Sequence, residues 1–188
     1  MRIISGKYKG LKLNLPKNKN IRPTLDKLKE AVFSMIDSNK YSDNLNGKLF
    51  LDLFAGSGAL GLEAFSRNAS KVYLIEIKEE ALNLINSNIK KLNLSDKEKK
   101  NIILLKCDVM NLQNIDFPYF DFIYIDPPYE QKNFYDLLNH LIENKIVNNR
   151  SLIFIETNEQ LKNLHRQFTT LVTKKFGKTY IILLKLIG

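Results

Sequence analysis

The segment LDLFAGSGALG, residues 51–61, decides the fold. It joins a short apolar run to three glycines, Gly56, Gly58 and Gly61, in G-x-G-x-x-G spacing. A strand followed at once by such a turn and by a helix is typical of sheets that bind a nucleotide-like ligand over their carboxyl edge. A tight turn that binds no ligand can have the same sequence, so the surrounding residues must decide between a ligand-binding turn and a purely structural one.

Apolar runs and helical patterns alternate around this segment. Strands are expected at residues 48–54, 71–77, 102–108, 120–126 and 151–157, and helices at 60–67, 79–92, 134–143 and 160–167, with a solvated loop at 96–100. Strands this apolar are buried on both faces, and the helices between them imply right-handed crossovers. The sequence therefore predicts an α/β fold with a doubly wound, mostly parallel sheet. Residues 171–176 and 179–186 are expected to close one edge as an antiparallel hairpin.

The N-terminal residues differ from the rest in charge and pattern. RIISGKYKGLKLNL, residues 2–15, alternates apolar and basic positions, so we expect residues 1–20 to form a small basic β-hairpin extending from a main domain at 21–188. Thr24 is expected to cap the first helix of that domain. Residues 1–40 contain ten Lys or Arg and three acids, whereas residues 41–188 contain nineteen and seventeen. The basic N-terminal segment favours a polyanionic partner.

The remaining composition excludes several classes of protein. Cys107 is the single cysteine, so neither a disulfide framework nor a cysteine-rich zinc site can form within the chain, and no metal is needed. No apolar run approaches the roughly 20 residues that span a bilayer. We therefore expect a cytoplasmic, monomeric protein without a membrane partner.

Acidic side chains accompany the first three strands. Asp52 lies just before the glycines, where it would repel a pyrophosphate but suits a ligand with an ammonium group, such as S-adenosylmethionine. Glu76 ends the next strand and can accept hydrogen bonds from both hydroxyls of a ribose. Asp108 follows the third strand, where it either binds an adenine amino group, with Val109 or Met110 lining the base pocket, or caps a turn.

The tetrapeptide DPPY, residues 126–129, follows the fourth strand. An exocyclic amine of a base is a poor nucleophile because its lone pair is delocalised into the ring. The Asp126 carboxylate and the Pro127 carbonyl can accept its two N–H bonds and direct the nitrogen toward a methyl donor. Pro127 and Pro128 fix the backbone, and Tyr129 offers a face on which an extruded base can stack. The same letters could form a plain turn, but the glycine turn upstream favours a catalytic corner.

These motifs together resemble the bacterial 16S ribosomal RNA guanine-N2 methyltransferase family. The resemblance runs nearly end to end, through residues 2–13, 22–36, 51–67, 73–77 and 120–130. The segment RPTLDKLKEAVFSMI, residues 22–36, matters most, because DNA adenine methyltransferases share the glycine turn and the DPPY motif. Lys29 stands where we expect this family to favour Arg, and Ser5 and Lys7 also depart from its pattern.

The resemblance implies a role for each matching residue. The residues expected to hold S-adenosylmethionine are Asp52, Phe54, Ala55, Gly56, Ser57, Gly58, Glu76, Asp108 and Val109. Those expected to act on the guanine amine are Asp126, Pro127, Pro128 and Tyr129. Those expected to bind ribosomal RNA, within a small-subunit ribonucleoprotein, are Arg2, Lys7, Lys9, Arg22, Thr24, Lys27 and Lys29.

Three other functions compete with this interpretation. DNA adenine-N6 methylation uses the same tetrapeptide, but such enzymes generally carry a sizeable target-recognition domain, and no insertion here is long enough to be one. A catalytically silent RNA-binding module should have lost Asp126 or the glycines. A nicotinamide oxidoreductase is disfavoured by Asp52, whose charge opposes a pyrophosphate.

Overall fold

The structure is a computed structural model that describes residues 1–16, 24–38, 40–41, 44–113, 115–128, 133–161 and 164–187, with Thr24 and Leu25 described as backbone only. Its helices are α1 (Thr24–Ile36), α2 (Ala59–Ser66), α3 (Glu79–Lys91), α4 (Asp96–Lys99) and α5 (Phe134–Glu143). Its strands are β1 (Leu49–Asp52), β2 (Lys71–Glu76), β3 (Ile102–Lys106), β4 (Phe122–Ile125), β5 (Leu152–Thr157), β6 (Phe168–Phe176) and β7 (Thr179–Leu186). Among the described residues, no helix combines the length and apolar character needed to cross a membrane.

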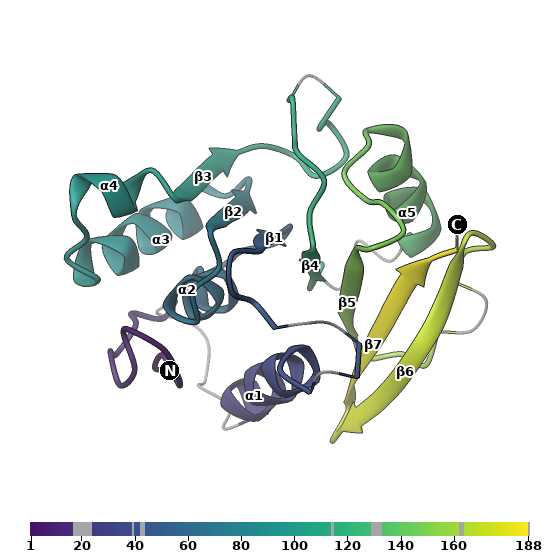
Figure 1. The fold of residues 1–188 in the computed structure, drawn as a ribbon, viewed down its shortest axis with the longest axis horizontal. Coiled ribbons are helices and arrows are strands. Elements are labelled where there is room, and N and C mark those ends of the chain that lie inside the picture. Colours follow the sequence, from purple (N-terminus) through teal and green to yellow (C-terminus); the bar gives the residue numbers. More distant parts are fainter. Residues whose placement is uncertain are drawn as a thin grey trace.

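The seven strands form one sheet in the order β3-β2-β1-β4-β5-β7-β6 (Figure 1). The first five strands pair in parallel, while β7 is antiparallel to both β5 and β6. This arrangement confirms the predicted doubly wound sheet with an antiparallel hairpin at one edge. Because β1 to β5 run the same way, the residues that follow them meet at a single carboxyl edge.

Helices cover the two faces of the sheet unequally. α1, α2 and α3 pack on one face, where Phe33 of α1 stacks on Phe50 of β1 with ring centroids 6.1 Å apart. α5 and the described residues of the β3–β4 connection, 107–113 and 115–121, cover the other face (Figure 1). On that second face the ring of Tyr73 contacts Phe117 and Phe120 of the connection. Alternate residues of β1, β2, β4, β5 and β7 point into these two cores, which explains why these strands are mostly apolar, whereas the edge strand β6 is largely exposed.

The N-terminal segment is more closely integrated than the sequence predicts. It folds back on itself through a single antiparallel bridge between Arg2 and Lys12, and neither arm is a regular strand. Ile3 is fully buried and Leu13 is 5% exposed, and both belong to the core shared with α1 and α2. We expected an extension outside the core, whereas these two apolar side chains are part of it.

Two local predictions are wrong. Residues 160–161 and 164–167 form no helix, because the His165 ring accepts a hydrogen bond from the Gln167 N–H at 3.1 Å and its other ring nitrogen contacts Asn139 Oδ1 at 2.8 Å. Residues 96–99, predicted as a loop, form the short helix α4. A capping box begins this helix, since Ser95 and Glu98 satisfy each other's backbone N–H groups.

Candidate functional site

The glycine turn brings the end of β1 to the start of α2. Gly56 and Gly58 have φ angles of 56° and 78°, a region that residues with a side chain rarely adopt. The Ala55 N–H donates to the Ile75 carbonyl at 3.0 Å, which holds the turn against β2. A Cβ on Gly61 would lie 2.2 Å from a methyl carbon of Leu74, so this glycine lets α2 pack directly on β2. The three glycines of the motif therefore have distinct structural roles.

Asp52 lies beneath the turn and is 2% exposed. Its carboxylate accepts hydrogen bonds from the backbone N–H groups of Gly61 and Phe54, which lower its pKa. Burial has the larger effect, however, and together with the nearby Glu76 charge it raises the pKa of Asp52 to about 7. Asp52 therefore supports the turn from within, and any attraction it exerts on a bound cation would act through the turn.

Glu76 ends β2 beside the turn. One carboxylate oxygen accepts the N–H of Gly56 at 3.0 Å, and the other accepts those of Ile77 and Lys78 at 2.8 and 2.9 Å. The sequence placed Glu76 and the glycines at one edge, and this contact joins them. Asp108, after β3, accepts the Met110 N–H at 2.9 Å, so in this structure it caps a turn while remaining partly exposed.

A buried asparagine that sequence reasoning missed joins two parts of this region. The Asn88 side chain, from α3, donates to the Ser57 carbonyl at 2.8 Å and to the Asn14 carbonyl at 3.1 Å. Its oxygen accepts the Asn14 N–H at 2.7 Å, and no part of Asn88 is exposed. One side chain therefore fixes the end of the N-terminal segment against the glycine turn. A polar residue inside an amphipathic helix gives no sign of such a role.

The catalytic corner predicted from DPPY follows β4. Asp126 and Pro128 are exposed and Pro127 is partly buried, while Tyr129 lies outside the described residues. Asp126 follows directly after the paired part of β4, in which Tyr124 is opposite Asp52 of β1. The corner is thus one strand away from the glycine turn along the same edge. Both lie where a methyl donor and an amine-bearing base could meet.

Tyr124 and Glu156 form a second polar pair beside this corner. The buried Tyr124 hydroxyl donates to the Glu156 carboxylate, which stands at the end of β5. Burial raises the pKa of Tyr124 well above its usual value, and the charges of Glu156, Asp126 and Asp52 raise it further. Burial also raises the pKa of Glu156, although the hydrogen bond from Tyr124 opposes this. Tyr124 therefore stays neutral and donates its hydrogen bond, and Glu156 accepts it at the end of β5.

The basic residues assigned to RNA divide into several groups. Arg2, Lys9 and Lys27 are exposed. Lys7 is exposed as well, but its ammonium group forms an ion pair with Glu98. Arg22 lies outside the described residues, as does the side chain of Thr24.

For Lys29 the prediction is wrong. Lys29 is 1% exposed, its ammonium nitrogen lies 3.1 Å from a Glu63 carboxylate oxygen, and it also donates to the Arg2 carbonyl. Glu63 is itself fully buried and accepts the N–H groups of Ile4 and Ser5 at 2.7 and 2.9 Å. Lys29 therefore fastens α1 to α2 and to the N-terminal segment and cannot reach RNA.

The groups around the turn fit a cationic donor better than a phosphate ligand. Glu76 brings a carboxylate to the turn, and the buried Asp52 lies beneath it with a raised pKa. A Cβ on Gly56 would approach the Phe54 carbonyl no closer than 3.9 Å, so open space remains above the turn. Carboxylates repel phosphate, but they attract an ammonium or sulfonium group and accept hydrogen bonds from ribose hydroxyls. The residues present are therefore compatible with S-adenosylmethionine.

Comparison with known proteins places the chain in a family. Residues 1–185 match the family described as "Conserved hypothetical protein 95". The chain belongs to this family. The match spans nearly the whole chain, including the N-terminal segment and the glycine turn.

Curated relatives carry a functional name. A protein of Buchnera aphidicola subsp. Baizongia pistaciae named "Ribosomal RNA small subunit methyltransferase D" is 31% identical over 95% of this chain and 87% of its own length. A Haemophilus influenzae protein of the same name is 30% identical over 93% of this chain and 88% of its own length. A solved Escherichia coli structure has a TM-score of 0.82 at 24% identity, covering 100% of this chain and 98% of that one. These matches confirm the family resemblance and the fold predicted from the sequence.

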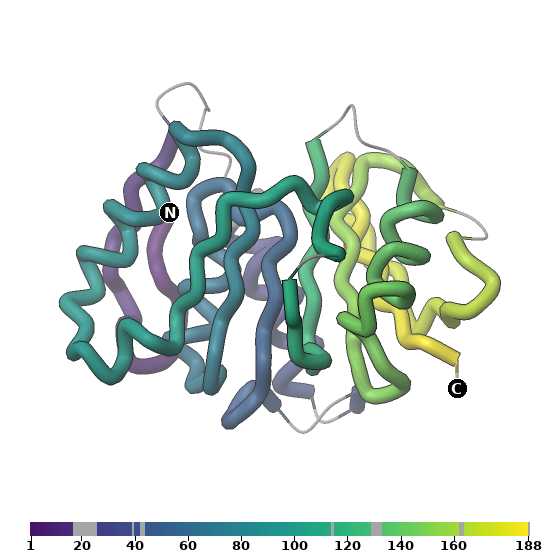
Figure 2. The backbone as a smooth tube through the Cα atoms, turned by 90° about the horizontal axis from the view of Figure 1, so that it is seen from above, coloured from purple at the N-terminus to yellow at the C-terminus, as the bar shows by residue number. Residues whose placement is uncertain are grey.

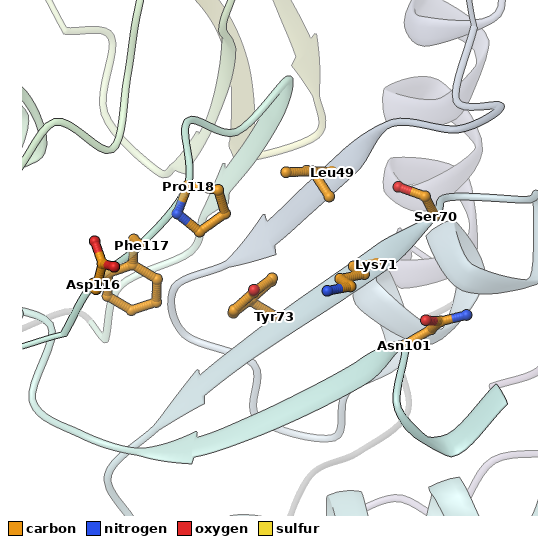
Figure 3. Close-up of a pocket in the computed structure, with 8 residues that line it drawn as sticks. All are labelled: Leu49, Ser70, Lys71, Tyr73, Asn101, Asp116, Phe117 and Pro118. Carbon is orange, nitrogen blue, oxygen red and sulfur yellow. The ribbon is translucent and has the colours of Figure 1, made fainter. Parts of the chain in front are cut away.

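A surface pocket of about 580 Å³ lies away from this candidate site. Its lining comes from the first residues of β1 and β2, from Asn101 before β3 and from residues 116–118 (Figure 3). These positions mark the amino ends of the strands, opposite the glycine turn and the Asp126 corner.

Proposed function

We propose that this protein transfers a methyl group from S-adenosylmethionine to the exocyclic N2 amine of a guanine in 16S ribosomal RNA. The observation that carries the proposal is the shared carboxyl edge, where the glycine turn and Glu76 lie one strand from Asp126. The names of the curated relatives support methyl transfer to small-subunit ribosomal RNA. The resemblance to the 16S ribosomal RNA guanine-N2 methyltransferase family implies the N2 position, and the carboxylates around the glycine turn favour the methyl donor.

The cofactor would be held by Glu76, the glycine turn and the segment around Asp108. S-adenosylmethionine supplies an electrophilic methyl group on a sulfonium centre. Glu76 would accept hydrogen bonds from the ribose hydroxyls, and Asp108, which accepts the Met110 N–H in this structure, would accept one from the adenine amine. The buried Val109 lines the base pocket.

Asp126 acts on the target base. Its carboxylate and the Pro127 carbonyl accept the two amine N–H bonds, which concentrates the lone pair on nitrogen and fixes its direction. The amine nitrogen forms the new N–C bond as the bond between the methyl group and sulfur breaks. The nitrogen is then positively charged and acidic and releases its proton to water, so no histidine base is required. The exposure of Asp126 leaves this side chain accessible to a base from a macromolecule.

The decisive experiment identifies the methylated nucleoside. The protein is incubated with labelled S-adenosylmethionine and, separately, with small-subunit particles, 16S RNA or duplex DNA, and each product is digested to nucleosides. We expect label in N2-methylguanosine from one of the ribosomal substrates. Label in N6-methyladenine from DNA would overturn the proposal, and label in no substrate would favour a silent RNA-binding module.

Replacement of Asp126 separates the target role from cofactor binding. We expect Asp126→Ala to reduce kcat by at least 100-fold, because the amine loses a charged acceptor that orients it. Cofactor affinity, measured by calorimetry, should change less than about threefold. If cofactor affinity collapsed while turnover survived at saturating cofactor, the assignment of Asp126 to the base would be wrong.

A further inference from the structure

The positive charge of this protein lies at both ends of the chain. Residues 41–159 contain thirteen Lys or Arg against seventeen acids, whereas residues 160–188 contain six Lys or Arg and no acid. The small net charge of residues 41–188 is therefore the sum of an acidic segment, residues 41–159, and a basic C-terminal segment, residues 160–188. A second basic segment exists besides the N-terminal one.

The fold carries part of this segment to the carboxyl edge of the sheet. β7 is antiparallel to β5, with Tyr180 opposite Thr157 and Ile181 opposite Glu156. The turn between β6 and β7 therefore projects past the end of β5, and the Thr179 hydroxyl contacts Asn158 Oδ1 at 3.4 Å. Figure 2 shows the yellow hairpin beside the green strand β5, and β4, which the catalytic corner follows, lies on the other side of β5. The turn lies beside Glu156, two strands from Asp126.

Three lysines of this hairpin are exposed and carry no ion pair. Lys174, Lys175 and Lys178 are exposed, and no described carboxylate lies within ion-pair distance of them. The Lys175 ammonium nitrogen lies 5.2 Å from the centre of the Tyr180 ring, which limits its motion without neutralising it. By contrast, exposed lysines such as Lys7 and Lys106 pair with Glu98 and Glu79. The hairpin lysines are thus available to an external anion.

Lysines on an edge strand can have a simpler purpose. β6 is the last strand of the sheet, and charged side chains on such strands prevent pairing between copies. This purpose accounts for Lys174 and Lys175. It does not account for Lys178, which lies in the turn beyond the paired strands, or for the lack of any acid after residue 159. An additional function is needed for the turn.

We propose that the turn end of the β6–β7 hairpin, through Lys174 and Lys175 of β6 and Lys178 of the turn, binds the phosphate backbone of the RNA that presents its base to Asp126. The inference rests on the proposed function, because it takes RNA as the substrate. The acidic segment repels phosphate, so the backbone must be held by the flanks of the site. Lysine ammonium groups displace the counterions of the RNA and make binding dependent on salt. The exposed basic residues of the N-terminal segment hold the other flank.

Charge removal at the turn tests this proposal. The variant Lys174→Gln, Lys175→Gln, Lys178→Gln is compared with Lys90→Gln, Lys97→Gln, Lys100→Gln, which removes the same charge from exposed, unpaired lysines on α3 and around α4. RNA affinity is measured from 50 to 300 mM KCl for the full-length variants with the 16S substrate established for the wild type. Thermal unfolding and cofactor affinity confirm that each variant is folded. A third variant with arginine at the three turn positions retains the charge.

We expect the turn variant to bind RNA at least tenfold more weakly, with the slope of log affinity against log salt reduced by about 2. The α3–α4 variant should lose less than threefold, and the arginine variant should retain wild-type affinity. Equal losses in the two glutamine variants, or an unchanged slope in the turn variant, would overturn the proposal. Failure of the proposed function is distinguishable, because it appears in the wild-type protein as methylation of DNA or of no substrate.

Discussion

The two halves of the sheet differ in the polar side chains near the carboxyl edge. In the half formed by β1, β2 and β3, several of these side chains form hydrogen bonds with the protein backbone. In the half formed by β4 to β7, several are exposed to solvent. Asp52, Glu76 and Asn88 each bind backbone groups of the glycine turn or of its neighbours. Asp126 and the turn lysines are exposed. The Tyr124–Glu156 pair lies between these exposed groups.

This difference indicates two kinds of ligand. Donors and acceptors that are already fixed lose little entropy on binding, which suits a small molecule held in one orientation. The exposed lysines instead attract a large polyanion and gain most from the release of its counterions, while the exposed Asp126 is open to a base. This difference agrees with our proposals that the β1–β3 half binds the cofactor and the β4–β7 half binds RNA. This interpretation would be wrong if replacing Asp52 or Asn88 left the free energy of unfolding unchanged.

The largest expected effect comes from Asp52. Its pKa is about 7 in the fold against a usual 3.8, so folding favours the protonated form. Its contribution to stability is complete below pH 4 and is lost as the pH rises to about 7, a change of about 4 kcal/mol. We expect the difference in unfolding free energy between the wild type and Asp52→Asn to change by this amount from pH 4 to pH 8, measured by urea unfolding.

Glu156 provides the comparison from the other half. Burial raises its pKa too, but the Tyr124 hydrogen bond opposes that effect. Glu156→Gln should therefore change the pH dependence in the same direction by a smaller amount. If the difference in unfolding free energy between the wild type and Asp52→Asn did not change with pH, Asp52 would already be ionised in the folded protein. The interpretation that Asp52 is closed off from solvent would then be wrong.

The second prediction concerns the buried ion pair. Lys29→Met removes the cation beside Glu63, and breaking a buried pair typically costs 3–5 kcal/mol. We expect about 3 kcal/mol, because Glu63 retains the Arg67 Nε–H at 2.8 Å and two backbone N–H groups. Urea unfolding measures the loss, with Lys174→Met as an exposed control that should leave stability unchanged. A stable Lys29→Met protein with weakened RNA binding would restore the original assignment of Lys29 to RNA.

The glycine turn, the strands and the position of Asp126 could be predicted because each depends on residues close together in the sequence. A G-x-G-x-x-G segment after an apolar run specifies its own turn, and a parallel sheet gathers whatever follows its strands. The capping box of Ser95 and Glu98 was also visible, since three residues separate them. It was overlooked because the charged stretch around it suggested a loop.

The burial of Lys29 could not be predicted from local patterns. Its partner Glu63 is 34 positions later, and the contact depends on how α1 crosses α2. The missing helix at residues 160–167 has a similar cause. Leu161 and Leu164 have helical spacing, but they contact the α5-side core from a loop held by His165, so tertiary contacts override the local preference.

The smallest of the three effects is expected at Asn88, the link between the two parts that bind cofactor and RNA in our proposals. Asn88→Ala leaves the Ser57 carbonyl and the Asn14 N–H and carbonyl without this partner, and unsatisfied buried groups typically cost 1–3 kcal/mol. We expect about 2 kcal/mol in urea unfolding, and a loss of about fivefold in cofactor affinity because the turn is less constrained.

A matched asparagine shows whether that loss is specific to the turn. Asn139 of α5 also contacts a distant loop, through the His165 ring at 2.8 Å, but it lies in the β4–β7 half of the molecule. Asn139→Ala should lower stability by a similar amount and leave cofactor affinity unchanged. If both variants weakened cofactor binding equally, the effect would follow from global stability, and Asn88 would have no particular hold on the glycine turn. A loss of cofactor affinity in Asn88→Ala alone would instead mean that the N-terminal segment and the glycine turn are coupled through one buried amide.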